Sequence, residues 1–122
     1  MKRLAIIATV LLLATTARTA ETKSYLTVSR LLAFCDSNDR GEELFCRGYL
    51  SGITDTIEDV RRVNKGAPCI NRPVQAEELK SVVVAFLRTH VRDDATSGDK
   101  PAASLASTAI GQAWCPSQTP GG

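Results

Sequence analysis

The chain has 122 residues, which is enough for one compact domain with a single hydrophobic core and too few for two domains of ordinary size. Its 15 basic and 13 acidic residues give a formal net charge of +2. So small a net charge does not create the long-range field that attracts nucleic acids or anionic membranes, and we expect neither as a partner.

The first 20 residues have the pattern of a secretory signal peptide. Lys2 and Arg3 precede an apolar run over residues 4–14, and small residues follow it. The run is shorter than the roughly 20 apolar residues that span a membrane. Cleavage after Ala17 is favoured over cleavage after Ala20, and an uncleaved anchor or a buried helix are the alternatives. Cleavage removes Lys2 and Arg3 and leaves 13 basic and 13 acidic residues, in a protein that we expect to be periplasmic and not membrane-bound.

Two helices are predicted in the first half of the exported chain. The first covers Tyr25 to Phe34, with Ser24 or Thr27 as its N-cap, and a polar turn follows it. The second covers Glu42 to Val63, where apolar residues recur every three or four positions and only two glycines disfavour a helix. Its acidic start and basic end also match the helix dipole.

Two further helices are predicted in the second half. After a connector with prolines and a glycine, the third covers Gln75 to His90. A polar loop over residues 92–100 leads to the fourth, alanine-rich helix from Ala102 to Trp114, which we expect to pack closely on its neighbours. We therefore expect an all-α fold, a small bundle of four to five helices held by disulfides, over residues 21–116, with a flexible tail at residues 117–122.

Four cysteines follow the signal peptide, and an even number in an exported protein favours two disulfides. Zinc sites usually pair their ligands two to four residues apart, which these cysteines do not, so we expect no metal. Three disulfide pairings are possible. If consecutive helices run up and down, the second helix separates Cys46 from Cys69 by about 25 Å, whereas bonded cysteines need Cα atoms within about 7 Å. We favour Cys35 with Cys46 and Cys69 with Cys115, and the longer loop should make the second bond the more stabilising one.

Gly48 and Gly52 form a Gly-x-x-x-Gly pair in the second predicted helix. Charged neighbours exclude the lipid environment in which this motif drives helix dimerisation. We interpret the pair as a place where this helix packs closely on another helix of the bundle. The alternative is a contact with a second subunit.

No group of residues has the pattern of a catalytic site. His90, the single histidine, ends the third predicted helix, where an imidazole commonly caps carbonyl groups. Asp55, Glu58 and Asp59 lie on the second helix, but acids on one helix surface do not build a cleft. We therefore expect a binding protein, not an enzyme, and no cofactor.

The segment from Phe45 to Ile53, with the sequence FCRGYLSGI, resembles the Rap/Tai family of immunity proteins. These are small periplasmic helical domains associated with type VI secretion amidase toxins. The similarity continues through Cys69, His90 and the Trp114–Cys115 pair, and it covers roughly residues 31–116.

The chain departs from the family pattern at two helix ends. Family members usually place a proline directly after the histidine and another before the final cysteine, where this chain has Val91 and Trp114. These positions affect a partner-binding loop more than they affect the fold.

The resemblance implies inhibition by occlusion. In this family the immunity protein, often a homodimer, inserts a loop between helices into the cleft of a peptidoglycan amidase and blocks its catalytic cysteine. The longest polar connector within the predicted bundle is our candidate for that loop, and a solvated linker without a partner is the alternative. The candidate contact residues are Arg92, Asp93, Asp94, Thr96, Ser97 and Asp99.

A second function class is a small periplasmic helical protein of the stress or chaperone type, without a toxin partner. It would bind unfolded clients at low pH. The near-neutral charge and the single histidine give this chain little response to pH, which favours the immunity function.

Overall fold

The computed structural model describes residues 25–116, so the predicted signal peptide and C-terminal tail lie outside the described residues. Within that range the chain is all-α, as predicted, and its one β-type contact is an isolated bridge between Thr27 and Pro101. None of the helices in the range is long and apolar enough to cross a membrane. The elements are α1 (Val28–Asp36), α2 (Arg40–Val63), α3 (Ala76–Asp93), the 3-10 helix η1 (Ala95–Asp99) and α4 (Ala102–Trp114).

Capping side chains explain where the first two helices begin. The Thr27 hydroxyl accepts a hydrogen bond from the backbone N–H of Arg30 at 3.3 Å, so α1 begins three residues later than predicted. The Asp39 carboxylate accepts one from the N–H of Glu42 at 3.0 Å, so α2 begins two residues earlier than predicted.

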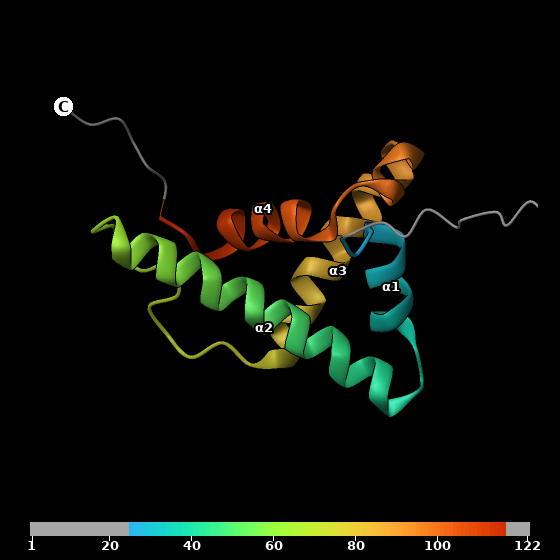
Figure 1. Ribbon diagram of the computed structural model, residues 1–122, viewed down its shortest axis with the longest axis horizontal. Coiled ribbons are helices and arrows are strands. Elements are labelled where there is room, and N and C mark those ends of the chain that lie inside the picture. The colour runs from blue at the N-terminus through green and yellow to red at the C-terminus, as the bar shows by residue number, and fades with distance from the viewer. Residues whose placement is uncertain (1–24, 117–122) are drawn as a thin grey trace, which may run out of the picture.

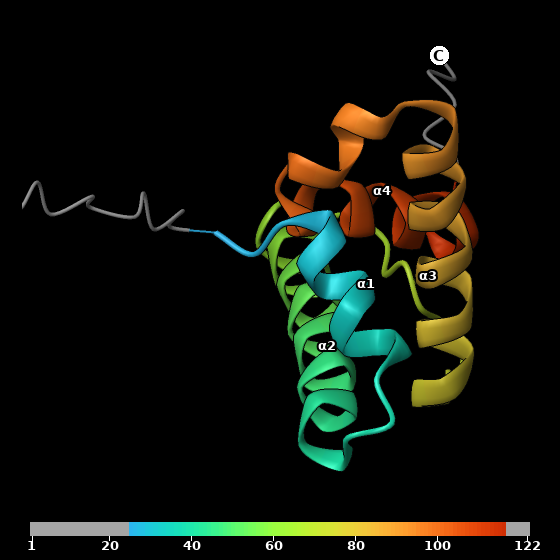
Figure 2. The same cartoon turned by 90° about the vertical axis from the view of Figure 1, so that its right-hand side faces the viewer.

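The four helices enclose one hydrophobic core. In Figure 1, α2 runs along the front, α3 crosses behind it and α4 lies above α2. Figure 2 shows α2 and α3 on opposite sides, with α1 in front of the space between them. Each helix contributes a large side chain that is fully buried, and together these residues fix how the helices pack. They are Leu31, Leu50, Leu87 and Ile110.

Small residues let α4 approach the other helices, as its composition predicted. Ala102, Ala106 and Ala109 are buried on its inner face beside Ile110. Because the side chain of alanine is a single methyl group, this face leaves room for the side chains of α1 and α3 in the core.

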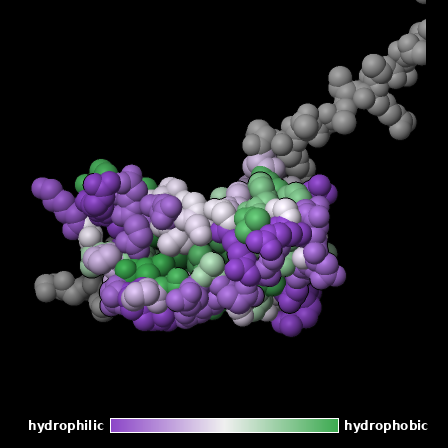
Figure 3. Space-filling view, turned by 90° about the horizontal axis from the view of Figure 1, so that it is seen from below, coloured by the Kyte–Doolittle hydropathy of each residue, from purple (hydrophilic) through white to green (hydrophobic). Residues whose placement is uncertain are grey.

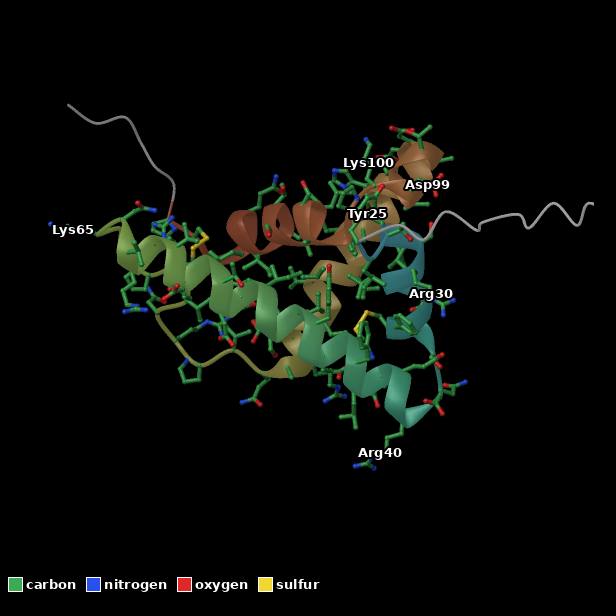
Figure 4. The ribbon with its side chains drawn as sticks, in the orientation of Figure 1. Tyr25, Arg30, Arg40, Lys65, Asp99 and Lys100 are labelled. Carbon is green, nitrogen blue, oxygen red and sulfur yellow. A yellow bond between two sulfur atoms is a disulfide. The ribbon has the colours of Figure 1, made fainter. Side chains whose placement is uncertain are left out.

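Two disulfides hold the ends of the bundle, and they have the pairing that the sequence favoured. Cys35 of α1 is bonded to Cys46 of α2. Cys69 of the connector after α2 is bonded to Cys115, the residue that follows α4. The two bonds lie toward opposite ends of α2 in Figure 4. No cysteine is left for metal binding or nucleophilic chemistry.

Candidate functional site

The segment expected as a polar loop is helical, and we call it the η1 corner (residues 92–100). α3 continues to Asp93, which places Arg92 and Asp93 in its last turn. Asp94 then starts η1, because its carboxylate accepts hydrogen bonds from the N–H and the hydroxyl of Thr96 at 3.0 and 2.7 Å. The prediction of a polar loop over residues 92–100 was therefore wrong, because most of the segment is helical. Figure 2 shows the corner arching over the top of the molecule.

The six candidate contact residues divide into exposed and buried ones. Ser97 is only 3% exposed, so its side chain is not available to a partner. The side chain of Asp93 is 65% exposed and that of Asp94 is 53% exposed. The corner therefore presents a compact group of polar side chains, and Figure 4 shows Asp99 on it near Lys100. The exposed members are Arg92, Asp93, Asp94, Thr96 and Asp99.

Hydrogen bonds within the corner stabilise the ionised form of Asp94. The bonds from Thr96, and then the positive charge of Lys100 with its Nζ 3.7 Å from the carboxylate, lower the pKa of Asp94. Asp93 pairs with Arg92 at 3.2 Å. An aspartate of ordinary pKa is already ionised at neutral pH, and the lowered pKa of Asp94 keeps this carboxylate ionised to lower pH.

A groove lies between the outer faces of α2 and α4, with a cavity volume of about 480 Å³. A Cβ atom added to Gly48 or to Gly52 would have no atom within 4 Å. The interpretation of these glycines as a site of close packing within the bundle was therefore wrong, because no described element lies over them. The residues that line the groove are Gly48, Tyr49, Gly52, Ile53, Thr56, Ile57, Val60, Ala103 and Ser107.

Exposed apolar side chains extend the groove along α2. Phe45 is 46% exposed and lies against Tyr49, with ring centroids 6.0 Å apart. At the other end of the helix Val60 and Val63 are 54% and 69% exposed. Tyr49 and Val60 belong to the apolar repeat of this helix, but the apolar stripe is wider than the core that covers it. Figure 3 shows that hydrophobic residues also gather in a patch on the lower face, with hydrophilic residues around it.

A polar cleft of about 620 Å³ lies beside the turn between α1 and α2. Its charged groups form ion pairs with one another and with the nearby Arg47. The guanidinium of Arg47 holds Glu43 at 2.6 Å and Glu77 at 2.7 Å, and the bond to Arg47 lowers the pKa of Glu43. Arg88 pairs with Asp36. These ion pairs join α2 and α1 to α3, which makes the cleft a structural feature.

Three of the residues considered for catalysis, His90, Glu58 and Asp59, have structural contacts. Nδ1 of His90 lies 3.0 Å from the carbonyl oxygen of Phe86 and donates to it, since a carbonyl only accepts. Glu58 accepts the N–H of Ile70 at 2.8 Å and so attaches the connector to α2. Asp59 pairs with Arg62. In residues 25–116 no group of three or more histidine, cysteine or acidic side chains could hold a metal ion.

Comparison with known proteins gives one match. A family model described as Rap1a immunity proteins matches residues 27–115, a range that runs from the N-cap of α1 to the cysteine that follows α4. Neither the curated proteins nor the solved structures gave a match. The matched range includes all four helices, both disulfides, the η1 corner and the groove.

Proposed function

Because the chain belongs to the Rap1a immunity protein family, we propose that it neutralises a peptidoglycan amidase toxin of a type VI secretion system in the periplasm by occluding the catalytic cleft of the toxin. Membership in the family gives an immunity function against a toxin and a protein partner. The amidase as target, the periplasm as location and occlusion as mechanism are what we propose. The family match is the observation that carries them.

The disulfides support a periplasmic location. Three of the four bonded cysteines are buried and Cys115 is half-buried, and such bonds persist in an oxidising compartment. The signal peptide predicted in the first 20 residues would deliver the chain there.

The η1 corner is the proposed occluding element. It joins two helices at one end of the molecule, and its exposed side chains are charged and polar. A fixed, protruding group of this kind fits a cleft better than the flat side of a helix does, and the charges give specificity for a complementary rim.

Charge reversal at Asp93 tests this element. We expect Asp93→Arg to weaken inhibition of the partner amidase about tenfold or more, because a like charge would face the rim that now accepts a carboxylate. Asp36→Arg is the matched control: Asp36 is 48% exposed and also paired with an arginine, but it lies at the opposite end of α1 from the η1 corner. The measurement is the release of peptides from peptidoglycan by a type VI secretion amidase from the same organism, at increasing concentrations of each variant. Failure of the unaltered chain to inhibit that amidase would contradict the proposed function.

The groove is the proposed contact with a second subunit. It is apolar and open, and the missing side chains of Gly48 and Gly52 let another helix approach α2 closely. This was the alternative interpretation of the glycine pair, and the open space above both residues supports it.

A long charged side chain in the groove should separate such a dimer. We expect Gly52→Arg to be monomeric at concentrations where the unaltered chain is dimeric, because the guanidinium would be buried in an apolar contact without a partner. Ser51→Arg is the control, since Ser51 is the neighbouring exposed residue of α2 and does not line the groove. Sedimentation velocity distinguishes the two states. Equal dimerisation of both variants, or a monomeric unaltered chain, would exclude the groove as a dimer interface.

A further inference from the structure

The η1 corner is docked on the first turn of α1. Gly98 is buried, and a Cβ atom at this position would lie 2.3 Å from Oγ and 3.7 Å from Cβ of Ser29. No described glycine has a positive φ, so the backbone at Gly98 would accept other residues. Glycine is therefore needed here for space and not for conformation.

Backbone hydrogen bonds hold the segment that follows η1. The N–H of Val28 donates to the carbonyl oxygen of Lys100 at 3.0 Å, and the N–H of Ala102 donates to that of Leu26 at 2.8 Å. These bonds form the isolated bridge next to Pro101. The chain entering α1 and the chain leaving η1 are thus joined side by side.

Hydrogen bonds within the corner make it a single unit. The N–H of Ser97 donates to the carbonyl oxygen of Asp94 at 2.9 Å, and the N–H of Lys100 donates to that of Ser97 at 3.2 Å. Asp94 also caps Thr96. A shift of Gly98 away from α1 would therefore move the exposed carboxylate of Asp94 with it.

We infer that Gly98 is a positioning residue for the proposed toxin-binding surface: its contact with Ser29 sets the place of the η1 corner before any partner arrives. This inference rests on the proposed function. A loop held in its bound conformation loses less conformational entropy on binding than a mobile one, and the saving appears as affinity. Gly98 touches no partner itself, because it is buried beneath the exposed side chains.

The test is a substitution that pushes the corner off α1, with a second substitution that makes room for it. Rotation of the Ser29 hydroxyl relieves only part of the overlap with a single methyl group, and an isopropyl group needs more space, so Gly98→Val is the main variant and Gly98→Ala the milder one. We expect Gly98→Val to raise the Kd for the amidase that the unaltered chain inhibits by about tenfold or more. The amide hydrogens of Ser97 and Lys100 should exchange faster in the free variant.

Adding Ser29→Gly to Gly98→Val removes the whole side chain that overlaps with residue 98 and should return both the Kd and the exchange rates toward those of Ser29→Gly alone. A substitution that merely destabilised the fold would not be rescued in this way. Gly111→Ala is the control, because its Cβ would meet only Sγ of Cys115 at 3.9 Å.

Two results would overturn the inference. One is Gly98→Val with the exchange rates and Kd of the unaltered chain. The other is a raised Kd that Ser29→Gly leaves unchanged. If Gly98→Val does not fold, Gly98→Ala is judged by the same two measurements. Hydrogen exchange is measured on the free protein, so it decides the positioning role even if the unaltered chain inhibits no amidase, which would instead defeat the proposed function.

Discussion

Loss of the disulfide between Cys69 and Cys115 is expected to lower the free energy of unfolding by about 4 kcal/mol, against about 3 kcal/mol for the bond between Cys35 and Cys46. The difference follows from the loops that the bonds close. Their cysteines are 46 and 11 residues apart, and the entropy that a cross-link removes from the unfolded chain grows with the logarithm of this separation.

The position of the longer-range bond adds to its importance. The connector between α2 and α3 has no helix of its own. Besides the bond from Cys69 to Cys115, hydrogen bonds to Glu58 and Arg61 attach it to α2. Without the bond to Cys115 the connector and the end of α4 lose their shared anchor. We expect this end of the bundle to exchange its amide hydrogens first.

Urea unfolding of two double variants checks the comparison. Cys69→Ala with Cys115→Ala should have a lower midpoint than Cys35→Ala with Cys46→Ala, at a similar dependence on urea. The second pair leaves its own small cavity, since Cys46 is fully buried, and this cost works against the expected order. A lower midpoint for the Cys35 and Cys46 variant would show that packing outweighs loop entropy in this fold.

The helices could be predicted from the sequence because each is long enough to repeat its apolar positions several times. The sequence placed α2 and α4 almost to the residue, and it placed both disulfides, because an up-and-down path separates Cys46 from Cys69. The first residues of α1 and α2 differ from the predicted ones by three and two positions. Several polar residues near each start could serve as the N-cap, and only the folded backbone selects one.

The η1 corner was not predicted as a helix, because its order comes from tertiary contacts. The sequence shows several polar residues and a glycine, which is the usual composition of a loop. The burial of Ser97 and Gly98 against α1 depends on residues about 70 positions earlier in the chain, a relation that local patterns do not contain.

The groove was missed for a related reason. Periodicity shows that a face of α2 is apolar, but it does not show what covers that face. Cys46, Leu50 and Ile53 are covered by the core, whereas Val60 is exposed on the same helix. The glycine pair was the one signal that could have identified the groove, because glycine inside a helix costs stability unless its missing side chain is used.

Two leucines of α2 allow a direct comparison of a buried and an exposed side chain in the same helix. Leu50 is fully buried, whereas Leu44 is 55% exposed. We expect Leu50→Ala to lower the free energy of unfolding by about 3 kcal/mol, because the side chain loses its burial and leaves a cavity among helices that cannot close around it. Leu44→Ala should change it by less than about 0.5 kcal/mol.

Because both substitutions replace leucine with alanine in the same helix, their effects on helix propensity cancel, and the difference reports burial alone. Thermal unfolding of the oxidised variants should separate their melting temperatures by on the order of 15 °C. Equal melting temperatures would mean that Leu44 is also buried in solution. In a solution of the free chain only a second copy could bury it, so at a lower protein concentration the melting temperatures of the two variants should differ again if association were the cause.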